Sequence, residues 1–179
     1  MIDIEFDEDL VENCQNYPWD ISFEDFIGDY HVDMRHTIDG RRDFDYDWIW
    51  DAAENDENLS EILAENSEGY CVRRINNSNP VTFVLFDEQS NACGFYSGVE
   101  SWIDPHHRGM DLSVMLISVA SFVGNGSPQN NGRAYGFSPS GLRSHQKAHE
   151  FLSLFAVDNG FEILEENKIE YFIPNRPAY

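Results

Sequence analysis

Three strand-like segments separated by short turns constrain the fold of this chain most strongly. Residues 70–75, 81–86 and 93–103 are rich in β-branched and aromatic side chains, and the segments between them, Asn77–Pro80 and Asp87–Asn91, have the composition of turns. Connections this short join neighbouring antiparallel strands. The sequence therefore predicts an antiparallel meander, in which Gly94 and Gly98 mark a bulge or a close backbone contact in the last strand.

Helical patterns flank this meander on both sides. The run Ser22–Asp25 resembles a capping box that opens a short helix ending near Gly28, and the apolar residues from 48 to 63 have helical spacing, in two pieces. After the meander, residues 112–123 predict a mostly buried helix that stops at Gly124. A further helix beyond Ser140 has an inner stripe and stops at Asn159–Gly160; the stripe consists of His145, Ala148, His149, Leu152, Phe155 and Ala156.

Short strands are predicted outside these elements, at residues 2–6, 134–138, 161–164 and 169–173. Together the segments give an α/β (α+β) fold with the order β-α-α-β-β-β-α-β-α-β-β and a mixed, mainly antiparallel sheet flanked by helices. The 179 residues include 13 Phe, 8 Tyr and 4 Trp, and no repeat or linker divides them. This predicts one domain over 1–179 with a sizeable core.

The net charge of −22 is unevenly distributed along the chain. Residues 1–68 hold 22 acidic residues against three arginines, whereas residues 106–149 hold one acid against four bases. A charge run of this kind has two interpretations, a solvated or salt-adapted surface and a surface for a cationic partner. Either one disfavours direct binding to nucleic acid, which needs a clustered basic face.

The cysteines, the N-terminus and the longest apolar run indicate where in the cell the protein is located. The three cysteines are odd in number and lack C-x-x-C spacing, which favours reduced thiols in a cytoplasmic protein. The N-terminus lacks the features of a signal peptide. The longest nearly apolar run has 12 residues, which is short of the roughly 20 that a membrane-spanning helix needs, so no membrane association is expected.

The loop between the meander and the next helix carries the clearest chemistry. After Ile103 the chain reads Asp-Pro-His-His-Arg-Gly-Met-Asp and then enters an apolar helix at Leu112. A helix that begins after a tight turn presents backbone N–H groups and the positive end of its dipole to an anion such as a pyrophosphate. Gly109 would let the backbone approach a phosphate closely, and Arg108 would add a charged donor.

This loop resembles the coenzyme A loop of the GCN5-related N-acetyltransferase (GNAT) family. The run Ile103–Leu112 matches the loop after the fourth strand of that family, and Gly160-Phe161 matches the end of its last major helix. The resemblance implies acetyl transfer from acetyl-CoA, as a cosubstrate, to a primary amine, without a metal. It also implies cofactor-binding residues, which are Ile103, Arg108, Gly109, Met110, Asp111, Leu112 and Ser113. His106 and His107 in the same loop and His149 on the later helix are further candidates for contact with the cofactor, and His149 fits a satisfied histidine under the sheet equally well.

Three positions depart from the family pattern. His106 stands where the family has Gln or Arg, and Asp111 stands where it has a second Gly. Asp111 could act as a helix N-cap, and its carboxylate would then compete with a phosphate for the same N–H groups. The tyrosine that protonates the leaving thiolate in the family falls on Ala156, for which Tyr135 or His149 are possible substitutes.

Glu100 is the candidate general base. Period-two alternation along a single strand over 93–103 would put it on one face with Tyr96, Gly98 and Trp102. An alkyl ammonium group with a pKa near 10.4 must lose a proton at pH 7, which costs roughly 4 to 5 kcal/mol, so a base in contact with the amine is needed. The alternative is a glutamate that faces solvent.

Other clusters fit metal or thiol chemistry less well. Residues 43–54 match an EF-hand calcium loop in their acidic positions, but Trp48 stands where the loop needs Gly, so an acidic loop entering a helix is the better interpretation. His31 and His36, with nearby Asp33 and Asp39, are interpreted as a chance grouping. Cys71 and Cys93 are predicted to be small strand residues.

The sequence thus predicts an N-acetyltransferase whose residues 1–68 form an acidic acceptor side and whose residues 69–179 bind the cofactor. The expected acceptor is cationic: a polyamine, an aminoglycoside-like amine or a Lys-rich segment of a basic protein. Two alternatives remain open, a catalytically silent GNAT-like interaction module and an acidic nucleic-acid mimic that inhibits a DNA-binding protein.

Overall fold

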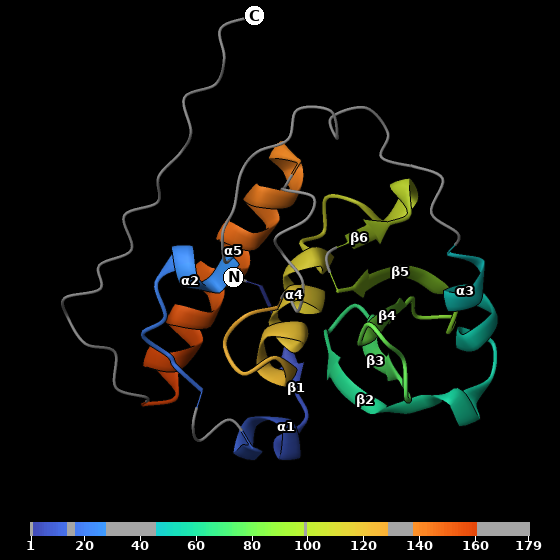
Figure 1. The fold of residues 1–179 in the computed structure, drawn as a ribbon, viewed down its shortest axis with the longest axis horizontal. Helices are drawn as coiled ribbons and strands as arrows, with labels where there is room; N and C mark the ends of the chain where they lie inside the picture. The colour runs from blue at the N-terminus through green and yellow to red at the C-terminus, as the bar shows by residue number, and fades with distance from the viewer. Residues whose placement is uncertain (1, 14–16, 28–45, 99, 129–137, 161–179) are drawn as a thin grey trace, which may run out of the picture.

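The computed structural model describes residues 2–13, 17–27, 46–98, 100–128 and 138–160 (Figure 1). In this part of the chain a six-stranded antiparallel sheet has the strand order β1-β2-β3-β4-β5-β6, so each strand pairs with its neighbour in sequence. The strands are β1 (Glu5–Phe6), β2 (Leu59–Glu65), β3 (Cys71–Ile75), β4 (Thr82–Phe86), β5 (Ala92–Ser97) and β6 (Glu100–Ile103). The predicted antiparallel meander is confirmed.

The helices lie in unequal layers on the two faces of the sheet. In Figure 1, α4 lies between the sheet and α5, α2 lies against α5, and α3 lies on the other side of the sheet. The helical elements are α1 (Glu8–Glu12), α2 (Phe23–Ile27), α3 (Asp47–Ala53), η3 (Asp56–Asn58), η4 (Pro105–His107), α4 (Leu112–Val123) and α5 (Pro139–Asp158). None of the helices in the described ranges combines the length and apolarity needed to cross a bilayer.

Two separate hydrophobic clusters share the sheet as their common wall. The larger one fills the space between the sheet and α2, α4 and α5, and includes Phe83, Leu85 and Leu116. The smaller one lies between the sheet and α3 and includes Ile49, Val84 and Phe95. All five residues of β4 are buried, because its side chains alternate between the two clusters.

Helix termini follow the local sequence closely. Ser22 Oγ accepts a hydrogen bond from Asp25 N at 3.1 Å, as the capping-box pattern predicts. The Asp25 carboxylate accepts from the Ser22 hydroxyl at 3.0 Å, in place of the backbone N–H that the full capping box uses. Gly124 and Asn159 are the C-caps of α4 and α5. Most members of the predicted inner stripe of α5 are buried, and the buried residues of this helix are Leu142, His145, Ala148, His149, Leu152 and Ala156.

The prediction of helix over Leu59–Leu63 is wrong, since this segment is strand β2. The register of β2 against β3 shifts twice, between Leu59 and Ile62 and between Ile62 and Ala64. Such bulges break the period of two, so the apolar side chains acquire a spacing that imitates a helix. Leu59 contributes to the smaller cluster and Ala64 to the larger one.

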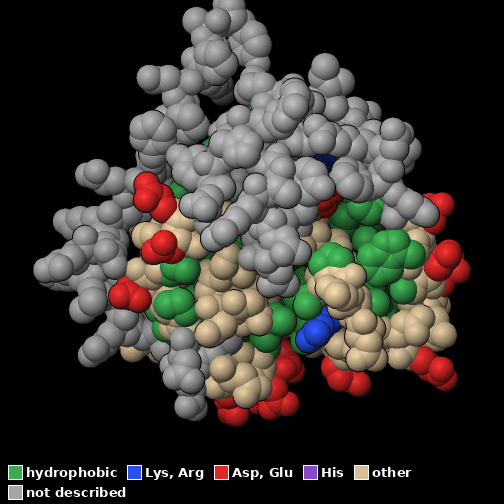
Figure 2. Space-filling view, in the orientation of Figure 1, with side chains coloured by type: hydrophobic (Ala, Val, Ile, Leu, Met, Phe, Trp, Pro, Cys, Tyr) green, Lys and Arg blue, Asp and Glu red, His purple; other side chains and the backbone are tan. Residues whose placement is uncertain are grey.

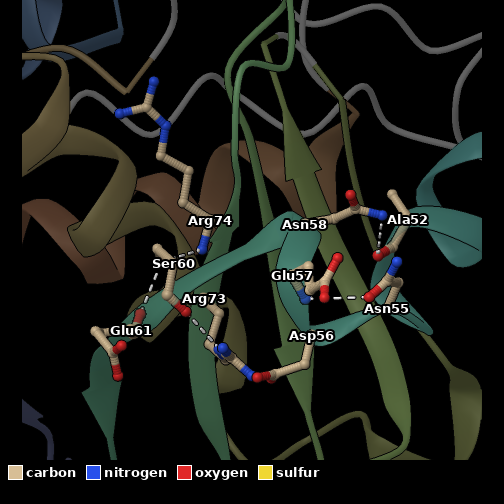
Figure 3. A network of polar contacts seen from close by, with 9 residues as sticks. All are labelled: Ala52, Asn55, Asp56, Glu57, Asn58, Ser60, Glu61, Arg73 and Arg74. Atoms are coloured by element: carbon tan, nitrogen blue, oxygen red, sulfur yellow. Dashed lines mark hydrogen bonds and ion pairs between the residues drawn. The ribbon is translucent and has the colours of Figure 1, made fainter.

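Polar contacts hold this irregular strand in place (Figure 3). Arg73 Nε donates to the Ser60 carbonyl at 2.6 Å, and its guanidinium pairs with Asp56 at 2.5 Å. Ser60 Oγ accepts from the backbone N–H of Arg74 at 2.9 Å. Side-chain bonds thus replace some of the regular ladder bonds at the bulge.

The prediction of one strand over Cys93–Ile103 is also wrong. The segment is a hairpin of β5 and β6, in which Ser97 pairs with Glu100 and Gly98 has a φ of +62° in the turn. Glycine adopts this left-handed conformation without a steric penalty, so the residue interpreted as a bulge is the turn itself. The close contact at Gly94 is confirmed, because a Cβ there would lie 2.9 Å from the Trp102 carbonyl oxygen.

The element order differs accordingly from the predicted one. Five strands, β2 to β6, stand between α3 and α4 where three were predicted, and three α-helices precede them where two were predicted. The GNAT order is therefore not reproduced in this part of the chain. The predicted strands at 134–138, 161–164 and 169–173 lie outside the described residues, except for Ser138, which is the N-cap of α5.

Candidate functional site

Two turns and a loop meet at the end of the sheet where β6 leads into α4. The turn of residues 66–70 precedes β3, the turn of residues 87–91 joins β4 to β5, and the loop of residues 104–111 follows β6. The two turns touch, since a Cβ at Gly69 would lie 3.0 Å from Glu88 Cβ. Asp87 closes the second turn by accepting bonds from the N–H groups of Gln89 and Asn91 at 2.9 and 2.8 Å.

Gly69 is needed at this junction for two reasons. Its φ is +87°, which disfavours any residue with a Cβ, and a Cβ there would be in tight contact with Glu88 Cβ at 3.0 Å. We expect Gly69→Ala to lower the free energy of unfolding by about 1 to 2 kcal/mol. Urea denaturation measures this change, and Gly109→Ala is the matched control for space: Gly109 also has a positive φ of +89°, but nothing lies within 4 Å of its Cβ position. An equal loss in both variants would show that only the backbone conformation matters.

The loop begins with a tight turn that Asp104 organises. Asp104 Oδ1 accepts from the backbone N–H of His106 at 2.9 Å and lies 2.9 Å from the His106 ring nitrogen Nδ1. These bonds from His106 hold the pKa of Asp104 below its ordinary value. His106 itself is 90% exposed.

Arg108 folds back onto the strand that precedes it. Its Nε donates to the Ile103 carbonyl at 2.8 Å, and this carbonyl points away from β5, because the neighbouring Asp104 N–H is the one that bonds to β5, at Cys93 O. Among the described residues, no carboxylate pairs with Arg108. The terminal nitrogens of the exposed guanidinium therefore remain available to an anion.

Asp111 does not cap helix α4 with its side chain. Its backbone has a φ of 55°, in the left-handed region, and no side-chain capping bond forms. Instead its carboxylate pairs with Lys147 Nζ of α5 at 2.6 Å. The competition with a phosphate that the sequence suggested at the first N–H groups of α4 is thus absent, and the negative charge of Asp111 is offset by an ammonium group.

The other predicted loop residues lie at the same helix end. Gly109 and Met110 are exposed, Leu112 is buried in the larger cluster, and Ser113 Oγ donates to Ser144 Oγ of α5 at 3.2 Å. The start of α4 and the first half of α5 are side by side at this point, so two helices border the loop.

The face predicted for Glu100 is only partly confirmed. Because β5 and β6 form a hairpin, Glu100 pairs with Ser97 and Trp102 pairs with Phe95, which puts these side chains on the α3 face of the sheet. Tyr96 pairs with Ser101 and faces the larger cluster. Glu100 therefore shares a face with Trp102, as predicted, but not with Tyr96.

His149 lies with the N-terminal helices and makes no contact with the loop that the structure describes. Its Nε2 donates to the Ile21 carbonyl at 2.8 Å, and its ring packs against Phe23 and Phe26 with centroid distances of 5.5 and 5.1 Å. Burial lowers its pKa. These contacts favour a structural role for His149 over the role of a cofactor ligand.

The remaining predictions divide by location. Cys71 and Cys93 are strand residues with free thiols, and burial raises the pKa of Cys93 to about 12. Asp47 and Asp51 lie on α3 and Glu54 caps its end, whereas Asp43 and Asp45 lie outside the described residues. His31, Asp33, His36, Asp39, Cys14 and Tyr135 also lie outside the described residues. In the described part, no group of three or more His, Cys, Asp or Glu side chains could hold a metal ion.

Two contacts at the site were missed by sequence reasoning. Tyr70, which precedes β3, places its hydroxyl 2.9 Å from His107 Nδ1, and Lys147 reaches Asp111. Both join residues more than 30 positions apart, so no local spacing signals them. The hydrophobic period of α5 predicts only that Lys147 lies on the exposed side of that helix, and it does not predict the contact with Asp111.

Comparison with known proteins adds no relative: no protein-family model, curated protein or solved structure matches the chain. The function of the chain is therefore inferred from the residues of the loop and from their contacts.

Proposed function

We propose that the protein binds acetyl-CoA at the loop of residues 104–113 and transfers the acetyl group to a primary amine of a cationic acceptor. The observation that carries this proposal is the side chain of Asp111, which pairs with Lys147 and leaves the first turn of α4 uncapped by a side chain. A helix N-terminus beside an exposed arginine suits a pyrophosphate group.

The exposed guanidinium of Arg108 supports an anionic ligand. Arg108 is held over the end of β6 by its bond to Ile103, and His106 and His107 are adjacent to it. The bond to Ile103 uses one of the five N–H donors of the guanidinium, and no described residue occupies the other four, which can form a charge-assisted pair with phosphate oxygens. In this proposal Gly109, whose Cβ position is open, allows close approach of the ligand.

Glu100 is the proposed general base for the transfer step, which requires the acceptor amine to approach from the α3 face of the sheet, where Glu100 lies. It would take a proton from the acceptor ammonium, directly or through one water, and the resulting amine would attack the acetyl carbonyl while the thiolate of coenzyme A leaves. Glu100→Gln removes the base without a change in size, so we propose this variant as the test of its role.

The proposed acceptor is cationic because the N-terminal part of the chain is strongly acidic. Its helices carry acidic side chains in their first turns, which are Glu8, Asp9, Glu24, Asp25 and Asp47. On the face in Figure 2, acidic side chains lie around the rim while hydrophobic ones lie between them. Such a rim attracts ammonium groups at low ionic strength and loses this effect in salt.

A ligand-induced shift in melting temperature tests the proposal. Acetyl-CoA at about a hundred times its dissociation constant stabilises a folded protein by roughly 2.7 kcal/mol. We expect this stabilisation for the wild-type protein, none for Arg108→Glu, and an intermediate effect for Arg108→Lys, which keeps the charge but loses the bond to Ile103. Acetate alone is the ligand control.

Three results would contradict or narrow the proposal. No shift with acetyl-CoA or with coenzyme A would exclude the binding site. An equal shift in wild type and Arg108→Glu would locate binding elsewhere. Binding without acetylation of any amine would favour the silent interaction module, for which Ala156 is the specific support, since it is fully buried where the resemblance expects a tyrosine.

A further inference from the structure

The hydroxyl group of Tyr70 meets the ring of His107 at the edge of the proposed site. Tyr70 Oη lies 2.9 Å from His107 Nδ1, and the two rings form an edge-to-face contact with centroids 5.8 Å apart. His107 adjoins Arg108 in the loop, whereas Tyr70 ends the turn that precedes β3, 37 residues earlier. The bond therefore connects the loop to the sheet.

Tyr70 is itself firmly placed. Its backbone N–H donates to Asn66 Oδ1 at 2.9 Å, and its carbonyl accepts from the backbone N–H of Asn66 at 3.0 Å. The turn between them is packed against Glu88 through Gly69. A hydroxyl carried on such a turn gives the His107 ring a fixed partner.

The donor in this bond follows from the chemistry of the two groups. Burial raises the pKa of Tyr70, and the nearby Cys93 and Glu68 raise it further, so its hydroxyl keeps its proton. A phenol O–H is a good donor, and the lone pair of a neutral imidazole nitrogen is a strong acceptor. When Nδ1 accepts, the single proton of the neutral ring must be on Nε2.

We propose that Tyr70 is a positioning residue for the anion-binding loop: it donates to His107 Nδ1 and holds the imidazole as the Nε2–H tautomer, whose N–H binds a phosphate oxygen of the ligand. This inference rests on the proposed function for the identity of the ligand, but not for the tautomer. Within the described part of the chain, His107 Nε2 bonds to no protein group, so this donor is available.

The tautomer is measured in the protein without ligand. Long-range ¹H–¹⁵N spectra at pH 8, where an ordinary histidine is neutral, distinguish a protonated from an unprotonated ring nitrogen. We expect His107 to show a protonated Nε2 and an accepting Nδ1 in wild type, and a mixture of both tautomers in Tyr70→Phe. A protonated Nδ1 in wild type, or an unchanged spectrum in Tyr70→Phe, overturns the proposal.

The dissociation constant for acetyl-CoA shows how much the orientation of the His107 ring contributes to binding. Loss of one oriented hydrogen bond corresponds to about a three- to tenfold higher dissociation constant for Tyr70→Phe. His107→Gln places an amide N–H near the position of Nε2 and is expected to bind like wild type, whereas His107→Asn is too short and is expected to bind like Tyr70→Phe. In the His107→Gln background, Tyr70→Phe should have no further effect.

The buried pair Tyr96 and His145 supplies a matched control. Its hydroxyl-to-ring distance is 3.0 Å, nearly the same as for Tyr70 and His107, but it lies between β5 and α5 in the core. Tyr96→Phe should therefore leave the affinity for acetyl-CoA unchanged. An equal loss of affinity in Tyr96→Phe and Tyr70→Phe would indicate a general effect on the fold and overturn the positioning role.

Failure of this inference is distinguishable from failure of the proposed function. If acetyl-CoA binds wild type and Tyr70→Phe equally well, the positioning role is wrong while the binding site stands. If acetyl-CoA does not bind wild type at all, the phosphate role is wrong together with the proposed function, and the spectra of the free protein still decide the tautomer.

Discussion

Leu152→Ala is expected to lower the free energy of unfolding by about 2 to 5 kcal/mol, whereas Leu154→Ala, two residues along the same helix, changes it by less than about 0.5 kcal/mol. Leu152 is 3% exposed and packs into the larger cluster, so its truncation loses apolar burial and leaves a cavity. Leu154 is 59% exposed, so its truncation loses little apolar burial and leaves no cavity in the core.

Urea denaturation of both variants measures the difference. The two substitutions change helix propensity equally, so this contribution cancels in the comparison. Similar losses in both variants would mean that the exposed side of α5 is covered by a contact that the described residues do not include. A small loss in both would contradict the packing of α5 against α4.

The stability of the protein is expected to fall by about 3 kcal/mol between pH 6.5 and pH 4 through His145 alone. Burial lowers the pKa of His145 from 6.5 to about 4, although the hydrogen bond from its Nδ1 to the Gly141 carbonyl opposes this shift. The unfolded chain binds a proton at this residue below pH 6.5 and the folded chain does not until about pH 4. The contribution to stability is therefore complete above pH 6.5 and is lost as the pH falls.

The comparison of wild type with His145→Asn isolates this contribution. The variant has no titrating ring, so its free energy of unfolding should depend less steeply on pH between 6.5 and 4 than that of wild type. The effect of acidic residues that titrate in the same range is shared by both proteins and cancels. Parallel pH profiles would show that His145 is solvated or protonated in the folded protein.

Elements with a regular local pattern were easier to predict than the irregular strands, for physical reasons. The stripe of α5, the capping box at Ser22 and the stop at Gly124 depend on contacts within four residues, so local spacing contains the information. The strand β2 was misassigned because its bulges, which are held by Arg73 across the sheet, disrupt the period of two. The β5–β6 hairpin was missed because Gly98 fits both a bulge and a turn.

The candidate site was predictable in part for the same reason. The loop of residues 104–111 and the start of α4 follow from Pro105, Gly109 and the apolar run that begins at Leu112. The partners of its side chains come from elsewhere in the chain, Tyr70 from the turn before β3 and Lys147 from α5. The sequence indicates that the carboxylate of Asp111 could compete with a phosphate. It does not indicate that this carboxylate pairs with Lys147, 36 residues later in the chain.

Strand β4 contributes side chains to both hydrophobic clusters. Leu85 faces the larger cluster and its neighbour Val84 faces the smaller one, so a slip of a single residue along β3 and β5 would exchange the contents of both cores at once. A shift by one residue would thus destabilise the larger and the smaller cluster together. Insertions or deletions within β4 should consequently be among the least tolerated anywhere in the gene, whereas added length in an exposed loop costs little.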